Sequence, residues 1–491
     1  MSEERRTKKS GTNKLNSKKR SGALDAILKL MAFVYVVITI IFYISVIKMN
    51  LLPGMYVTIF TVAEIVLTFA IVIGLVKKHK KATLNVICLI AILLISIVYV
   101  YVSNYAFATS NFLSNVFTKF SETEEYYIVV KSDSKYQKVE DIKGQEVYLF
   151  QIEDDIKTEI AGKASITFKS TNGLTEIGDQ LVNSKIQAIV VSSAQYSMLS
   201  EEIKDFQKKT KIIYTVTHKI ETKATIADQN STAKVQNGVF NVYISGIDTA
   251  GKITNVSRSD ANILATVNTK THEILLTSIP RDYYVTLHSK RAKDKLTHSG
   301  IYGVNETVTT IEDLLGIDIN YYVRVNFTTV IKLVDTLGGI DINSDYTFTA
   351  WDGTYFQKGY NHLDGAKALS FSRERESFVA GDNQRIKDQQ IVIEAIINRV
   401  MDSKTILTKY TSILNSLEGT FQTNISQDEI SSLVRDQLSN MSSWTIKTYS
   451  LTGTNATATT YSMGSQRLYV MIPNSSSVQE AKSKISQVMG K

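Results

Sequence analysis

Three apolar runs dominate the first hundred residues. They cover about residues 30–47, 55–76 and 84–102, and Pro53-Gly54 makes the turn before the second run. A helix needs roughly 20 apolar residues to cross a bilayer, so three such runs joined by short polar turns favour membrane spans over buried core helices. A cleaved signal peptide fits poorly, because the basic leader is long and two more runs follow the first.

The lysines and arginines around these runs set an expected orientation. The leader is strongly basic from Arg5 to Arg20, the second loop reads KKHKK at 77–81, and the first loop carries only Lys48. Cytoplasmic loops are enriched in Lys and Arg, so both basic segments are expected inside the cell. We therefore predict a cytoplasmic tail (1–23), three transmembrane helices (24–103) and an extracellular remainder.

Glu64 lies near the middle of the second run, where an ionisable side chain is costly. A partner on another helix is one way to accommodate it. The sequence does not assign a functional role to Glu64.

The segment after the membrane runs alternates strand and helix patterns. Residues Tyr126–Val130, Glu146–Phe150 and Ala188–Val191 have strand patterns, and Glu176–Asn183 has a helical one. This predicts a small α/β accessory domain over 104–225. No catalytic cluster stands out in it, which favours a structural or regulatory role.

A polar linker is expected at 226–237, and the pattern changes at Gly238. Strands are predicted at Val239–Ile244, Ala261–Asn268 and Glu273–Ser278, and helices at Asn305–Leu315, Thr328–Leu337 and Asn383–Met401. A short strand (Arg467–Ile472) and a helix end the chain. Strands alternating with helices are typical of a layered α/β domain.

Composition and charge narrow the functional classes. Of the 491 residues, 44% are hydrophobic and 21% are charged, which suits folded domains plus membrane spans better than disorder. The first 103 residues hold 14 Lys/Arg and four acids, a net charge of +10, which leaves about −2 of the chain's +8 for the rest. The large C-terminal part is therefore not a basic nucleic-acid-binding body. The single cysteine, Cys88, excludes an internal disulfide and a Cys-based zinc site.

Acids and arginines gather at the ends of the predicted elements, where open α/β sheets usually bind ligands. Clustered arginines suit a phosphate-rich ligand, because a guanidinium donates paired hydrogen bonds to phosphate oxygens. Asp248 and Asp260 are candidates to hold a Mg²⁺ that bridges a diphosphate. The competing interpretation is ordinary surface ion pairing, with Arg373-Glu374-Arg375 as a solvated loop. The residues concerned are Asp248, Arg258, Asp260, Arg281, Asp282, Arg373, Glu374, Arg375, Asp382, Arg385 and Gln389.

Other common catalytic signatures are missing from the sequence. The six histidines are scattered without metal-ligand spacing, and neither a Gly-rich P-loop nor a GxSxG elbow occurs.

Residues 238–402 strongly resemble the LytR-CpsA-Psr family of cell-wall glycopolymer ligases. The matching stretches occur in family order with suitable spacing and cover about a third of the chain. The three spans and the accessory domain look like the streptococcal capsule-biosynthesis CpsA branch. The stretches are GID (246–248), RSDANIL (258–264), SIPRDYYV (278–285), LLGIDINYYVRVNF (314–327), LVDTLGGIDI (333–342), HLDGAKALSFSRER (362–375) and GDNQRIKDQQ (381–390).

The resemblance implies a fold and an activity. The expected fold class is α/β, with a layered α-β-α catalytic domain around a central mixed sheet (238–491), preceded by the accessory domain and the three spans. The implied enzyme is a membrane-bound phosphotransferase of a Gram-positive bacterium. It would move capsular polysaccharide or another anionic glycopolymer from undecaprenyl diphosphate to a peptidoglycan hydroxyl. A pyrophosphatase side activity is also expected.

The resemblance also assigns roles residue by residue. Arg258, Arg281, Arg373, Arg375 and Arg385 would grip the diphosphate with help from Gln389, and Asp248 and Asp260 would bind Mg²⁺, with Mn²⁺ as an alternative. Asp382 would position or deprotonate the acceptor. Asp388 departs from the family, because many relatives carry a second arginine there, so the grip on the diphosphate is expected to differ at that point.

The reaction that the resemblance implies is phosphoryl transfer, in which a protein mainly positions reactants and stabilises charge. Expected partners are the lipid-linked glycan, peptidoglycan, membrane lipid and other capsule-assembly proteins, but no nucleic acid. The polyprenyl tail needs an apolar slot, and the Ile, Leu and Val residues of 301–342 would line one or simply pack the core.

Two alternatives remain open at this point. The basic tail suits a membrane-bound transcription regulator, although about twenty residues without a helix-turn-helix would bind DNA only nonspecifically. A non-catalytic lipid-diphosphate sensor that controls capsule assembly would use the same arginines as the enzyme, so turnover has to separate the two.

Overall fold

The computed structural model describes residues 8–49, 54–76, 82–117, 122–220, 238–247, 253, 256–440 and 442–490. These residues form two compact units. One unit holds the N-terminal helices together with residues 427–440, and the other holds the remaining residues.

The first unit is helical and contains the three predicted spans. Its helices are α1 (Lys8–Met49), α2 (Gly54–Val76), α3 (Ala82–Phe117) and α15 (Gln427–Asn440). The segments Ala26–Lys48, Gly54–Val76 and Val86–Asn104 are each long and apolar enough to cross a membrane, which confirms the three runs. The first loop and the basic KKHKK loop lie outside the described residues.

Aromatic side chains pack α1, α2 and α3 together. The rings of Phe42 and Tyr99 stack with centroids 4.1 Å apart. The Tyr99 hydroxyl donates to both carboxylate oxygens of Glu64, at 2.7 and 2.8 Å. Glu64 therefore does have a partner on another helix, and this contact offsets the cost of a polar group at that depth.

The accessory domain is built on a five-stranded sheet of order β3-β2-β4-β1-β5. The three predicted strands and the helix are present. Prediction missed β3 and β5, which lie at the two edges of the sheet. β3 is short and largely exposed, whereas β5 carries the apolar residues Ile212, Ile213, Tyr214 and Val216, a signal that sequence reasoning missed. The strands are β1 (Glu122–Lys131), β2 (Glu146–Leu149), β3 (Thr167–Ser170), β4 (Ala188–Ser192) and β5 (Thr210–Ile220), and the helices are η1 (Val139–Ile142), α4 (Asp154–Ala161), α5 (Leu174–Val182), α6 (Ser193–Glu202) and α7 (Phe206–Lys209).

β5 ends at Ile220, and the predicted linker at 226–237 lies outside the described residues.

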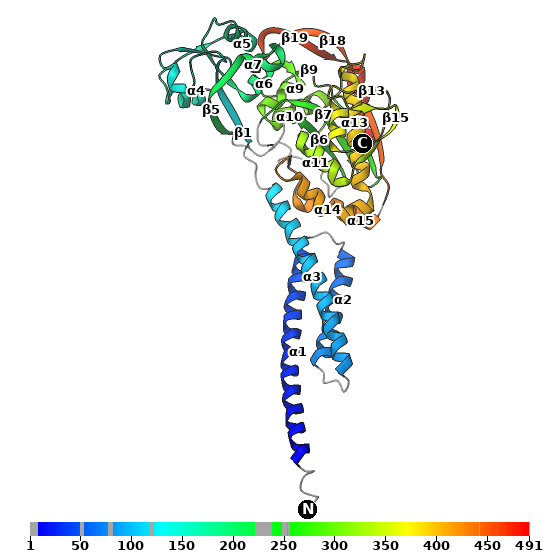
Figure 1. The fold of residues 1–491 in the computed structure, drawn as a ribbon. Coiled ribbons are helices and arrows are strands. Elements are labelled where there is room, and N and C mark those ends of the chain that lie inside the picture. The colour runs from blue at the N-terminus through cyan, green and yellow to red at the C-terminus, as the bar shows by residue number, and fades with distance from the viewer. Residues whose placement is uncertain are drawn as a thin grey trace, which may run out of the picture. The chain divides into compact units, whose positions relative to one another are not determined.

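The main domain, residues 238–426 and 442–490, contains a six-stranded sheet of order β16-β11-β6-β7-β8-β17 (Figure 1). β6 pairs parallel with β11, and β8 pairs parallel with β17, whereas the other neighbours are antiparallel. This confirms the expected mixed sheet. The strands are β6 (Val239–Ile247), β7 (Ser259–Asn268), β8 (Glu273–Ser278), β11 (Tyr321–Val325), β16 (Phe421–Thr423) and β17 (Thr445–Ser450).

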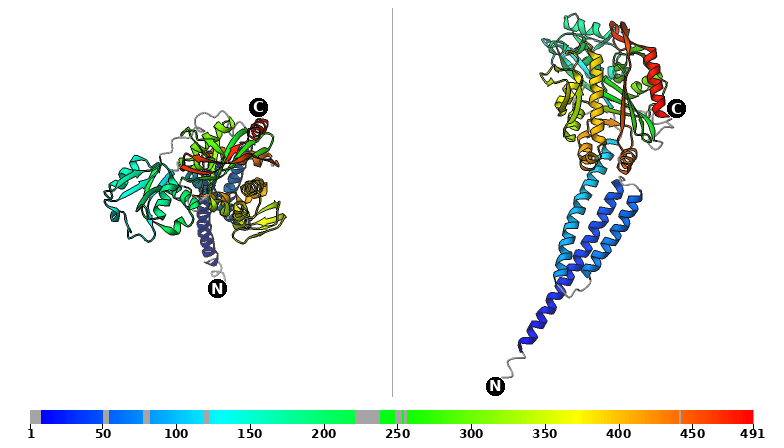
Figure 2. Two further views of the ribbon diagram at one scale, coloured as in Figure 1. Left: turned by 90° about the horizontal axis from the view of Figure 1, so that it is seen from above. Right: turned by 90° about the vertical axis from the view of Figure 1, so that its right-hand side faces the viewer.

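Helices cover both faces of this sheet, as the layered prediction requires. The long helix α13 and the terminal helix α16 run on opposite sides of it (Figure 2). α10 lies with α16, whereas α11 and α12 pack with α13. The helices are α9 (Leu296–Ser299), η3 (Gly300–Tyr302), α10 (Val304–Leu315), α11 (Phe327–Leu337), α12 (Gly365–Arg373), α13 (Asp382–Met401), α14 (Ser403–Leu417) and α16 (Ser475–Met489).

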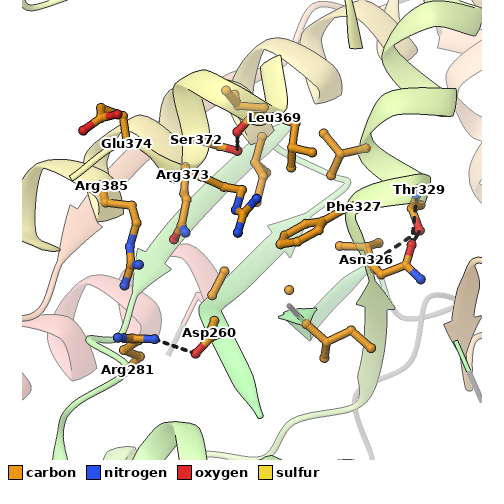
Figure 3. A pocket seen from close by; sticks show the side chains of 18 of the residues that line it. Asp260, Arg281, Asn326, Phe327, Thr329, Leu369, Ser372, Arg373, Glu374 and Arg385 are labelled. Atoms are coloured by element: carbon orange, nitrogen blue, oxygen red, sulfur yellow. Dashed lines mark hydrogen bonds and ion pairs between the residues drawn. The ribbon is translucent and has the colours of Figure 1, made fainter. Parts of the chain in front are cut away.

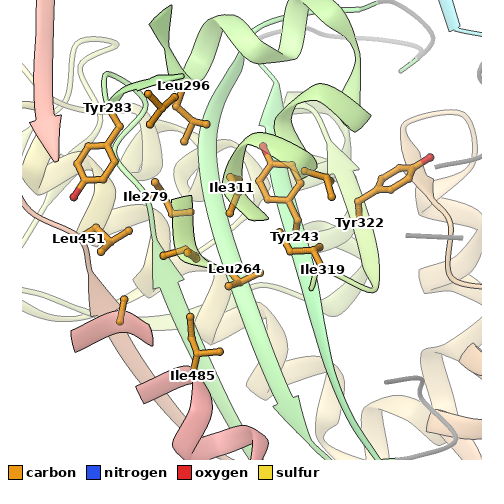
Figure 4. Packing of buried hydrophobic residues seen from close by; sticks show 14 of the residues in the cluster. Tyr243, Leu264, Ile279, Tyr283, Leu296, Ile311, Ile319, Tyr322, Leu451 and Ile485 are labelled. Atoms are coloured by element: carbon orange, nitrogen blue, oxygen red, sulfur yellow. The ribbon is translucent and has the colours of Figure 1, made fainter. Parts of the chain in front are cut away.

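The core between the sheet and α10 and α16 is apolar and tightly closed (Figure 4). Tyr243 of β6 lies opposite Leu264 of β7, and both side chains are fully buried with Ile311 of α10 and Ile485 of α16. Burying side chains of this size stabilises a fold by roughly 1.5–3 kcal/mol each. This layer holds the strand ends in place on the side away from the candidate site.

Four two-stranded antiparallel sheets complete the main domain. They pair β9 (Tyr284–Thr286) with β10 (Lys293–Lys295), β12 (Ile340–Ser344) with β15 (Gly359–Leu363), β13 (Phe348–Thr349) with β14 (Tyr355–Phe356), and β18 (Gly453–Thr460) with β19 (Gly464–Pro473).

Candidate active site

A cavity of about 610 Å³ lies where β6, β8 and β11 end and β7 begins, on the side of the sheet covered by α11, α12 and α13. This is the sheet edge at which the sequence places its charged residues. The charged residues that line it are Glu201, Arg258, Asp260, Arg281, Arg373, Glu374, Arg375, Glu376 and Arg385, and its uncharged polar lining includes Gln389. All five predicted arginines, Asp260 and Gln389 are therefore brought together.

Arg281 and Asp260 form the centre of the polar half (Figure 3). The Nη1 atom of Arg281 donates to Oδ1 of Asp260 at 2.9 Å, and the Thr297 hydroxyl donates to the same oxygen at 3.0 Å. Burial alone would raise the pKa of Asp260, but Arg281, Arg258 and Arg385 outweigh it and lower the pKa to about 2. Asp260 is therefore an anion throughout the physiological pH range.

Glu201 of the accessory helix α6 reaches the same place. Its two carboxylate oxygens form ion pairs with different arginines, Oε2 with Arg258 and Oε1 with Arg281, the latter at 3.3 Å. Burial would raise the pKa of Glu201, but the two guanidinium groups lower it. Sequence reasoning missed this residue, because no local motif links an acid in the accessory domain to strand ends that follow it in the chain.

The Arg373-Glu374-Arg375 segment is held by the middle residue. Oε1 of Glu374 accepts the backbone N–H groups of Arg375 and Ser377, each at 2.9 Å, and Oε2 accepts that of Trp351 at 2.7 Å. Burial would raise the pKa of Glu374, but these backbone hydrogen bonds lower it. Figure 3 shows the Glu374 carboxylate turned away from Arg281 and Arg385. Glu374 therefore shapes the loop and leaves the arginines to face the cavity.

Arg373 and Arg375 belong to different local structures, although they are only two residues apart. Arg373 is the last residue of α12, and the chain becomes extended only at Glu374. The Arg373 guanidinium lies over the rings of Phe327 and Trp351, 4.2 and 5.5 Å from their centroids. Stacking of this kind restrains the orientation of the planar group. Arg375 is exposed and also lines the cavity.

Helix α13 contributes the remaining polar groups. Arg385 points toward Arg281 in Figure 3 and forms an ion pair with Asp382. Burial lowers the pKa of Arg385, and the positive charges of Arg281 and Arg375 lower it further. The negative charge of Asp382 raises this pKa, but not enough to reverse the shift. Within the described part of the chain, the buried Nε atoms of Arg281 and Arg385 have no hydrogen-bond acceptor. Unmet buried donors next to one another are suited to an anionic ligand.

Asp382 and Asp388 do not line the cavity. Asp388 is buried in α13 and accepts a hydrogen bond from Gln384 at 2.9 Å. Burial raises the pKa of Asp388 to about 7, with further contributions from Asp345 and Glu374. Asp388, the residue that departs from the family pattern, therefore lies behind the cavity wall.

The other half of the cavity is apolar. The sequence left open whether the Ile, Leu and Val residues of 301–342 line a slot or fill a core. Three of them, Val325, Val330 and Leu333, line the cavity together with side chains of α13. The apolar lining comprises Ile244, Ile247, Val325, Phe327, Val330, Leu333, Trp351, Leu369, Val392, Ile393, Ile396 and Ile397.

The predicted metal ligands can be followed only in part. Asp248 lies outside the described residues. Across the residues that are described, no three or more His, Cys, Asp or Glu side chains meet in a group able to hold a metal. An ionised Asp260 has the chemistry of a Mg²⁺ ligand, because hard cations prefer carboxylate oxygen.

The chain was compared with protein families, curated proteins and solved structures. The model of the LytR_cpsA_psr family matches residues 195–482.

Three curated relatives carry the name polyisoprenyl-teichoic acid–peptidoglycan teichoic acid transferase TagU. The protein from Bacillus mycoides is 35% identical over 201 residues, which cover 40% of this chain and 65% of the relative. The one from Enterococcus faecalis is 36% identical over 200 residues, or 40% and 65%. The one from Bacillus licheniformis is 37% identical over 192 residues, or 39% and 61%. The chain thus spans less than two thirds of the length of these relatives.

Similar solved structures include TagU of Bacillus subtilis, at 32% identity and a TM-score of 0.40 over 52% of this chain and 97% of that one. A structure of TagT bound to LI-WTA is 26% identical, with a TM-score of 0.45 over 54% of this chain and 96% of the other.

Proposed function

The chain belongs to the LytR_cpsA_psr family, and we propose that it transfers an anionic glycopolymer from a polyprenyl diphosphate carrier to peptidoglycan. We propose undecaprenyl diphosphate as the carrier and capsular polysaccharide, or another anionic cell-wall polymer, as the cargo. The names of the TagU relatives, which specify a polyisoprenyl-linked teichoic acid and peptidoglycan, support the general reaction.

The observation that carries the proposal is the division of one cavity into two chemical halves. Five arginines line one half, and aliphatic side chains from α11 and α13 line the other. A lipid diphosphate has the same division, because its phosphates need charge-assisted hydrogen bonds and its hydrocarbon needs a dry apolar wall. Neither an entirely polar nor an entirely apolar ligand would use the whole cavity.

The reaction that fits this ligand is phosphoryl transfer. A peptidoglycan hydroxyl attacks the phosphorus that bears the glycan, forming a new P–O bond. The bond between that phosphorus and the bridging oxygen breaks, and polyprenyl monophosphate leaves. The acceptor loses its proton to a base or to solvent. The result is a glycan joined to peptidoglycan through one phosphate.

The arginines have distinct roles in this scheme. Arg281 and Arg385 face one another across the polar half and offset charge on the leaving monophosphate. Arg373, held over Phe327, and Arg375 bind the transferred phosphoryl group, while Arg258 and Gln389 complete the grip. Asp382 orients Arg385 through their ion pair. We also propose that Asp382 positions or deprotonates the acceptor hydroxyl.

We also propose a Mg²⁺ requirement, with Asp248 and Asp260 as ligands and Mn²⁺ as a substitute. Arg281 and Thr297 both donate to Oδ1 of Asp260, which leaves Oδ2 as the atom suggested for the ion. When bound, the ion would supply positive charge to the diphosphate. Binding of Mg²⁺ measured by calorimetry on the full chain should weaken in Asp260→Asn, and unchanged affinity would rule out this ligand.

The main and accessory domains are proposed to lie outside the cell, with both basic segments inside. Accessibility labelling can test this in a Cys88→Ser background. An impermeant thiol reagent on intact protoplasts should label Asp133→Cys, whose side chain is well exposed, and spare Ser17→Cys. Labelling of Ser17→Cys but not of Asp133→Cys would show that the chain has the opposite orientation in the membrane.

Turnover separates the enzyme from a non-catalytic sensor. The purified full chain in detergent would receive a polyprenyl diphosphate-linked oligosaccharide and a peptidoglycan fragment, and released polyprenyl monophosphate and coupled product would be measured. We expect wild type to form coupled product and to release at least an equal amount of polyprenyl monophosphate, the excess arising from hydrolysis. Arg399→Ala is the matched control, because Arg399 is exposed on α13 and does not line the cavity. Binding of the lipid without any turnover would favour the sensor.

A further inference from the structure

The accessory domain contributes one carboxylate to the arginine site. Glu201 lies at the next-to-last position of α6, and its side chain bridges Arg258 and Arg281. A carboxylate that offers one oxygen to each of two guanidinium groups makes the same kind of contact as two oxygens of a phosphate. Glu201 therefore occupies part of the position that a phosphate ligand requires.

The backbone of α6 is firmly held, so Glu201 is presented from a fixed scaffold. Ser192 and Gln195 cap its first turn reciprocally, and the Gln195 side chain donates to the carbonyl of Phe150 at 2.8 Å. Met198 and Leu199 are buried in the accessory core. The position of the Glu201 backbone is thus set by packing that does not involve the arginines.

The accessory domain is also joined tightly to the β18–β19 hairpin. Leu174 donates its N–H to the carbonyl of Met463 at 3.1 Å, and Ser465 donates to that of Asn172 at 3.2 Å. At Gly464, where φ is +77°, an added Cβ atom would collide with the carbonyl oxygen of Asn172. Close backbone contact of this kind disfavours a hinge between the two domains.

The Glu201 side chain itself has room to leave. It is 37% exposed, whereas the side chains of Arg258 and Arg281 are 11% and 12% exposed. Rotation about its side-chain bonds would move the carboxylate into water, where its charge is solvated, and would leave the arginines in place.

We propose that Glu201 is a built-in competitor for the arginine site, a carboxylate that an incoming phosphate group must displace and that sets the affinity of the site for phosphate ligands. Because it returns to Arg258 and Arg281 when the ligand departs, it also favours release of the phosphorylated product. This inference rests on the proposed function, since it assumes that the arginines bind phosphate.

The competitor has a measurable cost in affinity. An apparent dissociation constant rises in inverse proportion to the fraction of molecules that can bind. If Glu201 is paired with the arginines in nine of ten molecules, as an order-of-magnitude estimate, its removal should tighten binding about tenfold. A carboxylate that only positioned the arginines would act in the opposite direction, because its loss would weaken binding.

The test is calorimetric titration of inorganic pyrophosphate into the full chain in detergent. Glu201→Gln removes the charge and keeps the side-chain size, and we expect a Kd about tenfold lower than that of wild type. Glu202→Gln is the matched control, because Glu202 is adjacent in α6, receives a hydrogen bond from Gln466 and does not line the large cavity. Its Kd should stay within about twofold of wild type. Thermal melts accompany each titration.

Glu201→Asp provides a second variant should Glu201→Gln fold poorly. It keeps the charge but is one methylene shorter, so it should bridge the two arginines less well and tighten binding by an intermediate factor. Unchanged or weaker binding in the Glu201 variants overturns the inference, as does equal tightening in Glu202→Gln.

Arg281→Ala separates this failure from failure of the proposed function. If Arg281→Ala abolishes pyrophosphate binding while the Glu201 variants behave as wild type, the phosphate site stands and only the competitor is wrong. If Arg281→Ala binds as wild type does, pyrophosphate does not use this site and both conclusions fall.

Discussion

The polar and apolar halves of the cavity are built from different parts of the fold. The polar half combines strand ends, such as Arg258 before β7 and Arg281 after β8, with residues at the end of α12 and in the first turns of α13. The apolar half consists mainly of side chains from the body of α11 and α13, for example Leu333 and Ile393. Strand ends can offer directed hydrogen bonds from a few fixed groups, whereas a helix face offers a continuous surface without direction. The two halves should therefore respond differently to mutation.

The largest effect is expected at Arg281, which forms ion pairs with both Glu201 and Asp260. Arg281→Ala removes the charge-assisted hydrogen bonds to the ligand and leaves Asp260 without its main counter-charge. Each such bond is worth roughly 1.5–3 kcal/mol, so turnover should fall by about a hundredfold. Steady-state kinetics with the lipid-linked donor would measure this. Activity within threefold of wild type would place the diphosphate elsewhere.

Arg373 and Arg375 should show smaller losses that depend on guanidinium shape. Lysine keeps the charge but loses the forked donor pair, so Arg373→Lys and Arg375→Lys should weaken turnover, and the alanine variants by about tenfold or more. Arg373→Lys should suffer more than Arg375→Lys, because Arg373 also stacks on Phe327 and Trp351. Melting temperatures should stay near wild type. Normal rates in both alanine variants would mean that these side chains only face solvent.

Substitutions in the apolar half should depend on the length of the lipid tail. Ile393→Ala and Ile397→Ala each remove a half-buried part of the cavity wall. Loss of one to two buried methylene contacts at roughly 0.8 kcal/mol each should raise KM for a long polyprenyl donor about fourfold to fifteenfold. A ten-carbon donor should be affected less than twofold. Equal effects on both donors would show that these residues act through the core and not through the tail.

Substitution of Asp388 should affect activity least, because this residue lies behind the cavity. Its ionisation should nevertheless make the free energy of unfolding depend on pH. Its folded pKa of about 7 exceeds the usual value of 3.8, so the folded state binds the proton more tightly than the unfolded state. The free energy of unfolding should therefore fall as pH rises from about 4 to 7 and then level off. Asp388→Asn should remove this loss, which is on the order of 2–4 kcal/mol at pH 8, and leave kcat within about twofold. Denaturant unfolding at pH 5 and pH 8 tests it, and identical pH dependence in both proteins would contradict it.

The sequence predicted the polar half well for a physical reason. Motifs such as SIPRDYYV and GDNQRIKDQQ place arginines directly beside element ends, and a sheet brings those ends to one edge. The apolar half was ambiguous, since Val330 and Leu333 have the same spacing whether they face a core or a cavity. Only the positions of α11 and α13 against the sheet resolve that question.

Two features of the candidate site could not be predicted from the local sequence. Glu201 belongs to another domain, and its contact with Arg258 depends on how that domain docks onto the β18–β19 hairpin. The role of Glu374 could not be predicted, because a carboxylate between two arginines has the pattern of a surface ion pair. In the structure it accepts hydrogen bonds from three backbone N–H groups. Both contacts are long-range or directional, and neither property leaves a periodic signal in sequence.

The most direct test of the amphipathic site compares two ligands that share a head group. Titration of farnesyl diphosphate and of inorganic pyrophosphate into the full chain would give two dissociation constants. Our account predicts that farnesyl diphosphate binds at least about tenfold more tightly, since a buried apolar tail adds favourable transfer free energy. It also predicts that Arg281→Ala weakens both ligands, whereas Ile393→Ala weakens only the farnesyl ligand. Equal affinities for the two ligands, or loss of pyrophosphate binding in Ile393→Ala, would contradict the account.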